Sequence, residues 1–242
     1  MDPFVKKPDP IAPEPEVEAR MADLSAYTVI GEETTDRRTD KLTFTSTGEA
    51  GSSAIYLRDG GTLYLKNPEI HGYGEMNETD LRNELGSKYG FCAAVLSNQK
   101  TSHVTLVNPK IVCHEQSTAN GAYAIFGGAV VIEGGTIDTC NRQGHGVDAS
   151  YGGHVYCNGT VIHTGGRNSG ALATDFQGGY ITVRDIDATT EIAGSPGIYT
   201  AGKSIITAYN SKFLSKGCEA VMVAHSLGHT YLYDCELTGT VA

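Results

Sequence analysis

Tryptophan is absent from this chain of 242 residues, and charged residues make up only 19 % of it. Glycine, in contrast, occurs 30 times. Many glycines with few charges are typical of a β-rich protein with many turns, and a chain of this length can bury a substantial core. No apolar run approaches the roughly 20 residues of a membrane-spanning helix, so we predict no membrane insertion.

Basic residues are also scarce. The chain carries 18 Lys and Arg residues against 28 Asp and Glu residues, a formal net charge of −10. Surfaces that bind nucleic acids or anionic membranes are basic, so we expect neither as the main partner. The N-terminus shows no apolar signal segment, because Pro3, Pro8 and Pro10 interrupt it.

Cys-x-x-Cys pairs are missing as well, so a zinc site has no support, and we predict no metal or other cofactor. The six cysteines are Cys92, Cys113, Cys140, Cys157, Cys218 and Cys235. An even number permits disulfides without requiring them.

The chain divides into three parts. Residues 1–20 hold five of the eight prolines, interspersed with charges, and predict a disordered tail or linker. Residues 21–49 contain two strand-like segments, LSAYTVI and KLTFTST, which we expect to begin or cap the folded part. Residues 50–242 repeat a single pattern.

The repeated unit contains three short runs of alternating apolar residues. In AIYLRDGGTLYLKNPEI these are Ile55 and Leu57, then Leu63 and Leu65, then Ile70. Six further units align with it, so that the first run falls at residues 55, 94, 124, 147, 171, 198 and 221. Alternate residues of a strand point to one side. One unit cannot shield its apolar row from water but a stack can, so the pattern predicts an all-β, single-domain solenoid of about seven coils.

One column of the alignment contains only Gly, Asn and Asp. Its members are Asn67, Asn108, Gly134, Gly159, Asp185, Asn210 and Asp234. These residue types tolerate left-handed backbone angles. We therefore predict a sharp bend at this point of every coil, with stacked Asn side chains hydrogen-bonded along the column.

Coils of about 23 residues with short strands in register resemble the right-handed parallel β-helix. That is the architecture of pectate lyases, polygalacturonases, phage tailspikes and many bacterial adhesins, the pectin-lyase-like superfamily. The resemblance covers residues 50–242 and concerns architecture, which does not by itself assign a function. Units such as GHGVDASYGG and SPGIYTAGK look like the glycine-rich coils of secreted, adhesin-like β-helix proteins.

Two extensions lengthen the first coils. They are residues 71–90, in which Glu78 to Leu85 are expected to form a short helix, and residues 113–123. Both leave the stack at the same corner and should lie side by side. Neighbouring loops on one face of a solenoid commonly form its binding surface; the alternative is that they only shield the first coils.

The candidate site residues come from the outward column of the first run. This column is predicted to read Tyr56, Val95, Ile125, Asp148, Leu172, Tyr199 and Met222. Coils stack about 4.8 Å apart, so residues two coils apart lie roughly 10 Å from each other. One shallow strip is thus expected to hold five candidate catalytic or sugar-binding residues, His145, Asp148, Asp175, Tyr199 and His225. The alternative is a solvated face without a ligand.

Gly144-His145-Gly146 matches the Gly-His-Gly of polygalacturonases. The companion motifs are not matched, because the preceding coil offers Phe126-Gly127-Gly128 instead of Asp-Asp and no Arg-Ile-Lys follows. The carboxyl pair of an inverting hydrolase, about 6.5 to 9.5 Å apart, is not evident. The alternative is a turn in which two glycines flank an exposed histidine.

A pectate-lyase-like enzyme would need calcium, held by six to eight oxygens, and an Arg or Lys as base. Arg184 is predicted to point outward without an acidic cluster beside it, so calcium is expected only if the protein is a lyase. Cys113 and Cys140 occupy neighbouring corners within disulfide reach, although free thiols fit equally well. Cys157 lies in an inward column and should be buried.

These patterns favour a secreted or surface-exposed scaffold that binds carbohydrate or a cell surface, as an adhesin does. A polysaccharide lyase or hydrolase that uses the outer groove is the alternative, and a structural spacer is the third. The expected partners are a carbohydrate or cell-surface ligand and, through an exposed end of the stack, a second copy of the chain.

Overall fold

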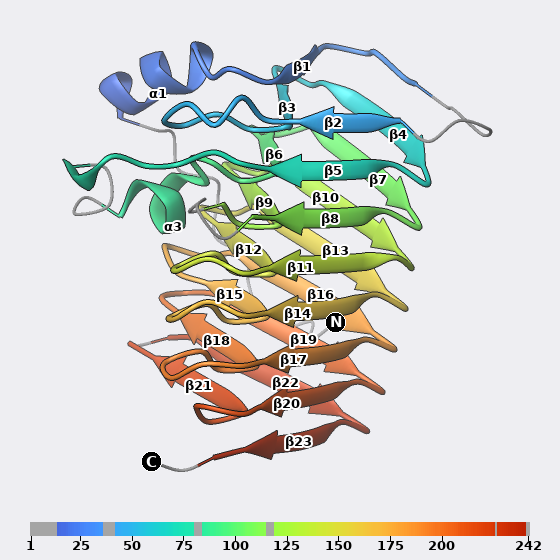
Figure 1. Cartoon of the computed structure of the whole chain (residues 1–242), viewed down its shortest axis with the longest axis vertical. Helices are drawn as coiled ribbons and strands as arrows, with labels where there is room; N and C mark the ends of the chain where they lie inside the picture. Colours follow the sequence, from blue (N-terminus) through green and yellow to red (C-terminus); the bar gives the residue numbers. More distant parts are fainter. Residues whose placement is uncertain (1–13, 36–41, 80–83, 115–118, 226, 241–242) are drawn as a thin grey trace.

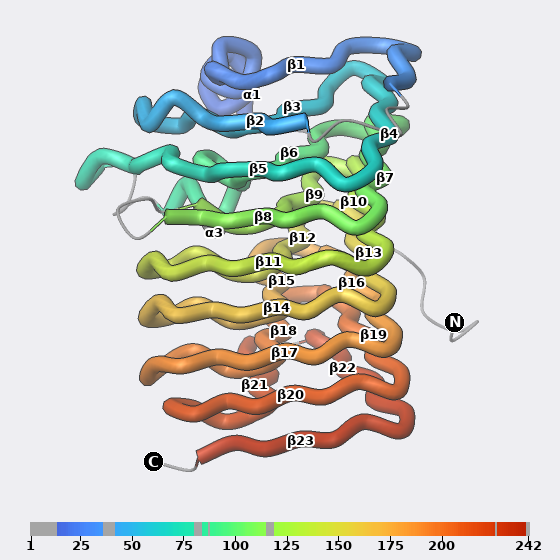
Figure 2. The backbone as a smooth tube through the Cα atoms, turned by 45° about the vertical axis from the view of Figure 1, so that its right-hand side comes forward, coloured from blue at the N-terminus to red at the C-terminus, as the bar shows by residue number. Residues whose placement is uncertain are grey.

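The protein is a parallel β-helix in which each rung contributes one short strand to each of three sheets. The computed structural model describes residues 14–35, 42–79, 84–114, 119–225 and 227–240. Figure 1 shows the strands of successive rungs lying side by side from β1 at one end to β23 at the other. Figure 2 shows the backbone advancing by one rung per turn.

Three parallel sheets result from this winding. Sheet I consists of β1 (Tyr27–Ile30), β3 (Ile55–Arg58), β6 (Val95–Asn98), β9 (Ala122–Ile125), β12 (Val147–Ser150), β15 (Leu172–Thr174), β18 (Ile198–Ala201) and β21 (Val221–Ala224). Sheet II consists of β4 (Thr62–Lys66), β7 (His103–Val107), β10 (Ala129–Glu133), β13 (His154–Asn158), β16 (Tyr180–Arg184), β19 (Ile205–Tyr209) and β22 (His229–Tyr233). Sheet III consists of β2 (Thr43–Thr45), β5 (Glu69–Gly72), β8 (Lys110–Cys113), β11 (Thr136–Thr139), β14 (Val161–Thr164), β17 (Asp187–Thr190), β20 (Lys212–Ser215) and β23 (Glu236–Gly239).

The number of rungs confirms the prediction of about seven coils. Complete rungs with one strand in each sheet run from β3 to β23. Strands β1 and β2 add a partial rung at the N-terminal end, since β1 pairs with β3 and β2 pairs with β5. The two segments LSAYTVI and KLTFTST therefore begin the stack, as their sequence indicated.

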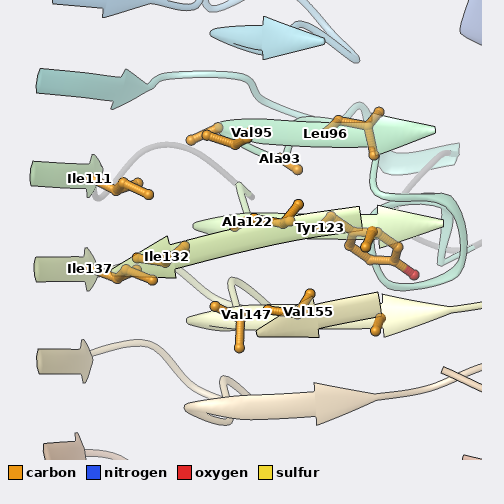
Figure 3. Close-up of a cluster of buried hydrophobic side chains, with 14 of the residues drawn as sticks. Ala93, Val95, Leu96, Ile111, Ala122, Tyr123, Ile132, Ile137, Val147 and Val155 are labelled. Carbon is orange, nitrogen blue, oxygen red and sulfur yellow. The ribbon is translucent and has the colours of Figure 1, made fainter. Parts of the chain in front are cut away.

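The apolar columns of sheets II and III also follow the predicted alignment. In sheet III, Ile70 pairs with Ile111, and Ile111 with Ile137. All three side chains are buried. In sheet II, Cys157 lies in register with Ile132 and is fully buried. Figure 3 shows such side chains stacked on successive rungs, which is how each rung removes the apolar surface of its neighbours from water.

The column of Gly, Asn and Asp forms the predicted bend between sheets II and III. Every member has a positive φ, for example 52° at Asn108, 64° at Gly159 and 54° at Asp185. The side-chain ladder is present at two adjacent pairs of the column. Asn108 Nδ2 donates a hydrogen bond to Asn67 Oδ1 over 2.9 Å, and Asn210 Nδ2 donates to Asp185 Oδ1.

Sheet I corrects the predicted alignment. The residues in register with Ile55 and Val147 are Val95, Ala122 and Leu172, so the predicted positions 94, 124 and 171 were wrong by one or two residues. The outward column therefore reads Tyr56, Leu96, Tyr123, Asp148, Ala173, Tyr199 and Met222. The error arose because both faces of this sheet are apolar in β6 and β9, so alternation did not distinguish them.

An extension of the first complete rung covers part of the outer face of sheet I. The side chains of that part are largely apolar. Residues 73–94 connect β5 to β6 and include the short helix α3 (Leu85–Tyr89), which packs against β12. A Cβ atom at Gly90 would lie 2.7 Å from the Tyr123 ring, so glycine permits this close approach. Of the helix expected from Glu78 to Leu85, Glu78 and Thr79 are helical and residues 80–83 lie outside the described residues. The expected helix does not continue to Leu85, because Glu84 has a left-handed φ of 55° and Leu85 begins the separate helix α3.

The N-terminal end of the stack differs from the sequence-based expectation. Residues 1–13 lie outside the described part, but Pro15–Ala22 form helix α1 instead of a disordered tail. Met21 is 2 % exposed, and the guanidinium of Arg20 lies 4.9 Å from the Phe91 ring centroid. Proline at the first helical position and this packing explain why the helix forms.

The opposite end leaves inward side chains exposed. Leu237 on β23 is 45 % exposed, whereas Phe213, its partner on β20, is 1 % exposed. Association of two copies through this end stays a prediction. Among the described residues, no helix is long and apolar enough to cross a membrane.

All six cysteines are free thiols. Cys113 pairs with Thr139 in the sheet register, so it lies one residue out of step with Cys140. The Cys113 thiol is fully buried and donates to the carbonyl of Asn120, whereas Cys140 donates to Asp138. Of the two open alternatives, the structure therefore has free thiols rather than a disulfide.

Candidate functional site

A pocket opens on the outer face of sheet I, just beyond the part covered by α3. Its volume is about 250 Å³. The residues lining it are Glu84, Gln143, His145, Asn168, Gly170, Asp175, Phe176, Gly194, Pro196, Tyr199 and Met222. In the sheet register, Ala173 lies between Asp148 on β12 and Tyr199 on β18. The short side chain of Ala173 leaves space between the rungs on either side.

His145 is fixed at the edge of this pocket by the rungs above and below. Its backbone N–H donates to Asn120 Oδ1 over 2.8 Å, and its Nδ1 accepts from the N–H of Gly170 over 2.9 Å. A neutral imidazole whose Nδ1 accepts must carry its proton on Nε2. Burial lowers the pKa of His145 to about 4, so the ring is neutral at pH 7. The residue is 7 % exposed, and the alternative of an exposed histidine in a turn was wrong.

Asp148 is sealed behind the pocket. The residue is fully buried, and among the described residues neither carboxyl oxygen has a hydrogen-bond partner. Burial raises its pKa well above the ordinary value, and the negative charge of Asp175 adds to this; the nearby N–H of Ala149 acts in the opposite direction. Both the shallow strip expected from the sequence and its alternative, a solvated face, are therefore wrong at this residue, because the extension carrying α3 covers it.

Asp175 is the carboxyl group that faces the cavity. It follows β15 in the turn toward sheet II, and its side chain is 16 % exposed. Its Oδ2 lies 3.7 Å from His145 Nε2, which is longer than a hydrogen bond. Burial, with the negative charge of Glu84 as the second cause, raises the pKa of Asp175 to about 7.

Four of the five candidate residues converge at this place. His145, Asp148 and Asp175 each offer an atom within 4.8 Å of the others. Tyr199 lines the same pocket, and burial followed by the charge of Asp175 raises its pKa. His225 does not line the pocket; it is exposed in the turn after β21.

By residue type, the three converging groups resemble a set of metal ligands. The proton on His145 and the small number of oxygen ligands fit better a cation that itself donates hydrogen bonds. The Nε2 atom of His145, which is the nitrogen nearest Asp175, carries a proton and cannot ligate a metal in this state. Calcium takes six to eight oxygen ligands, more than two aspartates supply. What the site offers chemically is two buried carboxyl groups and one fixed N–H donor.

A second hollow, the tyrosine groove, runs across the outer face of sheet II and has a volume of about 420 Å³. Its lining residues are Ala129, Val130, Val131, His154, Val155, Tyr156, Tyr180, Ile181, Thr182, Ile205, Thr207, Tyr209, Tyr231 and Tyr233. The groove thus spans β10, β13, β16, β19 and β22. It lies on a different sheet from the pocket lined by His145, Asp175 and Tyr199 on sheet I, which we call the acidic pocket.

The centre of the tyrosine groove is a single column of the sheet. Thr182 and Thr207 pair in register, with Tyr156 on the rung before them and Tyr231 on the rung after. Two small hydroxyl side chains therefore lie between two aromatic rings. The tyrosines of this column are half-buried.

Stacked rings border this column on both sides. The rings of His154 and Tyr180 stack with centroids 4.8 Å apart, and those of Tyr209 and Tyr233 stack at 4.9 Å. The Arg184 guanidinium lies 4.6 Å from the Tyr209 centroid. The sequence analysis missed this groove because it followed only the inward residues of sheet II. The signal was present in the outward residues of segments such as YITVR.

Comparisons with protein-family models, curated proteins and solved structures found no match to this chain. A proposed function therefore rests on the fold and on the chemistry of the two hollows.

Proposed function

We propose that the protein is a carbohydrate-binding β-helix, secreted or exposed at a cell surface, that holds a glycan chain in the tyrosine groove. The observation that supports this function is the column of Tyr156, Thr182, Thr207 and Tyr231, flanked by further aromatic rings. Aromatic faces pack against the apolar faces of sugar rings, and hydroxyl groups exchange hydrogen bonds with sugar hydroxyls.

The shape of the groove suits an extended ligand. Its lining residues come from five successive rungs, so it follows the helix axis for a distance of about 4.8 Å per rung. The groove is built on strands rather than on loops, so its rings are held in place by the register of the sheet. A rigid, preformed aromatic surface lowers the entropy cost of binding.

The test is a binding screen on a glycan array and on soluble polysaccharides. We expect Tyr209→Ala and Tyr231→Ala each to weaken binding of the selected glycan by about 2- to 10-fold, the effect of losing one aromatic contact. Tyr64→Ala is the matched control, because Tyr64 also points outward on sheet II but lies outside the groove. Equal losses in all three variants would contradict the proposal, as would no glycan binding at all, the result expected of a structural spacer.

A polysaccharide-active enzyme is the second candidate function, and one observation favours it. Asp175 faces a cavity and has a pKa raised to about 7 by burial, which is the property of a general acid that works at neutral pH. On this hypothesis Asp175→Asn and Asp148→Ala abolish depolymerisation in a polysaccharide-degradation screen. Unchanged activity in both variants would exclude the acidic pocket as the active site. A lyase has less support, since no Lys or Arg is among the described residues that line the pocket.

A further inference from the structure

The acidic pocket has an unbalanced charge. Glu84 and Asp175 line it, and Asp148 lies directly behind Asp175. No Lys or Arg belongs to the described lining. Some carboxylates elsewhere in the described chain are paired with cations, as in Glu69 with Lys110 at 2.7 Å and Glu191 with Lys216 at 2.8 Å. The pocket differs from these surface pairs because its acidic groups share one cavity.

Asp148 points to a missing hydrogen-bond donor. Its two carboxyl oxygens are buried and without partners among the described residues, and an unsatisfied buried polar group costs about 1–3 kcal/mol, more when it is charged. Such a group in a folded protein calls for an explanation, and strain, a catalytic role, or a bound water, ion or ligand are the usual ones. Because the carboxyl groups of Glu84 and Asp175 line the pocket and Asp148 lies behind them, a ligand that fits here should bring N–H or O–H donors and is favoured if it brings positive charge.

The other walls of the pocket are apolar and aromatic. Phe176, Tyr199 and Met222 contribute to the lining. Aromatic faces attract cations by about 0.5–2 kcal/mol, and they also pack against the carbon atoms that carry a cationic group. This combination fits an organic cation. A bare metal ion would leave the apolar walls without a partner, and the protonated Nε2 of His145 would face it.

We propose that the acidic pocket binds the primary ammonium group of a small organic amine. The ammonium donates to the carboxylate of Asp175, with Glu84 and Asp148 supplying further negative charge, while Tyr199 and Phe176 pack against the ligand's carbon atoms. The assignment does not depend on the tyrosine groove. It excludes proton donation by Asp175 while the amine is bound, so it competes with the second candidate function at this pocket.

Binding should be coupled to proton release. Without a ligand, Asp148 and Asp175 hold protons because their pKa values are raised, and a bound ammonium favours the ionised carboxylates. Affinity should therefore rise from pH 5 to pH 7.5. The other titratable groups near this pair are Glu84, His145, Tyr123 and Tyr199. His145 is neutral throughout this range, and the tyrosines keep their protons.

The experiment is isothermal titration calorimetry of the full chain at pH 7.5 with two pairs of probes. Glucosamine is compared with N-acetylglucosamine, and Nα-acetyl-lysine methylamide with its Nε-acetylated form. We expect each cation to bind at least about 10-fold more tightly than its neutral partner, the effect of one charge-assisted hydrogen bond. The cationic probe that binds more tightly shows whether the amine belongs to an amino sugar or to a lysine side chain. Equal affinity for cationic and neutral probes would overturn the proposal.

Two variants and two metal salts complete the test. Asp175→Asn keeps the shape of the side chain and should weaken amine binding at least about 10-fold, whereas Asp187→Asn, an exposed acid on β17, should leave it unchanged. Equal affinity of wild type and Asp175→Asn would overturn the assignment. So would stoichiometric binding of Ca²⁺ or Zn²⁺ that Asp175→Asn abolishes, because the pocket would then be a metal site. None of these results depends on glycan binding, so this proposal and the proposed function fail separately.

Discussion

At the scale of single residues, the acidic pocket shows how burial changes the chemistry of ordinary side chains. Asp148, Asp175 and His145 are all held near neutrality because the covered face of sheet I removes water from them. The carboxyl groups keep protons that they would lose in solution, and the imidazole loses one that it would otherwise gain at mildly acidic pH. Their opposite shifts make a specific prediction for stability.

Asp175→Asn should stabilise the protein at pH 7 but not at pH 4. The folded-state pKa of Asp175, about 7, is above its ordinary value of 3.8, so its contribution to stability is complete at low pH and is lost as the pH rises through 7. Asp175→Asn has no carboxyl group to ionise, so it does not lose this stability. Its free energy of unfolding should rise relative to wild type by up to about 4 kcal/mol between pH 4 and pH 7. Urea unfolding midpoints at both pH values measure the difference.

The contribution of His145 to stability changes with pH in the opposite direction over the same range. Its folded-state pKa of about 4 is below the ordinary 6.5, so its contribution is present at neutral pH and is lost as the pH falls through 4. Because Asp148 also holds its proton in the folded state, wild type should lose stability between pH 4 and pH 7 despite His145, and the Asp175→Asn profile should be markedly flatter. A stability difference that stays constant with pH would show that Asp175 is not protonated by the fold.

At the scale of elements, two features could be predicted from the sequence. They are the bends between sheets II and III and the inward faces of the strands in these two sheets. The bend column was predictable because a positive φ, which every member has, strongly favours Gly, Asn and Asp. The inward columns of sheets II and III were predictable because their strands alternate between buried and less buried positions, as in β7 and β13.

Sheet I was less predictable for a physical reason. In β6 and β9 all four residues are buried, because the outer face packs against the extension that carries α3. Strands buried on both faces show no period of two. The same cover moved Asp148 from an expected surface position to a sealed one. The convergence of His145, Asp148 and Asp175 was predictable only because residues about 25 apart become neighbours in a solenoid.

At Gly159, backbone strain in the bend can be tested separately from side-chain packing. Its φ is 64°, and a Cβ atom added there would meet nothing within 4 Å. Gly159→Asn should leave the free energy of unfolding within about 0.5 kcal/mol of wild type, whereas Gly159→Val should cost at least about 1–2 kcal/mol, since a β-branched residue disfavours this angle. Urea unfolding of both variants measures the two costs. Equal effects of Asn and Val would contradict a left-handed bend at this position.

At the scale of the whole molecule, the β-helix presents two hollows on two different sheets. The acidic pocket lies on sheet I below α3, and the tyrosine groove lies along sheet II. The net charge of −10 disfavours polyanionic ligands for either site. The architecture therefore allows the protein to bind a glycan along one face while a small cationic group occupies another, without the two ligands sharing residues.

Hydrogen–deuterium exchange with and without the glycan selected in the binding screen locates the bound glycan on the β-helix. We expect slower exchange in β13, β16, β19 and β22 on glycan binding, with unchanged exchange in β8, β11 and β14 of sheet III. Protection confined to sheet III, or spread evenly over all rungs, would contradict a binding site in the tyrosine groove.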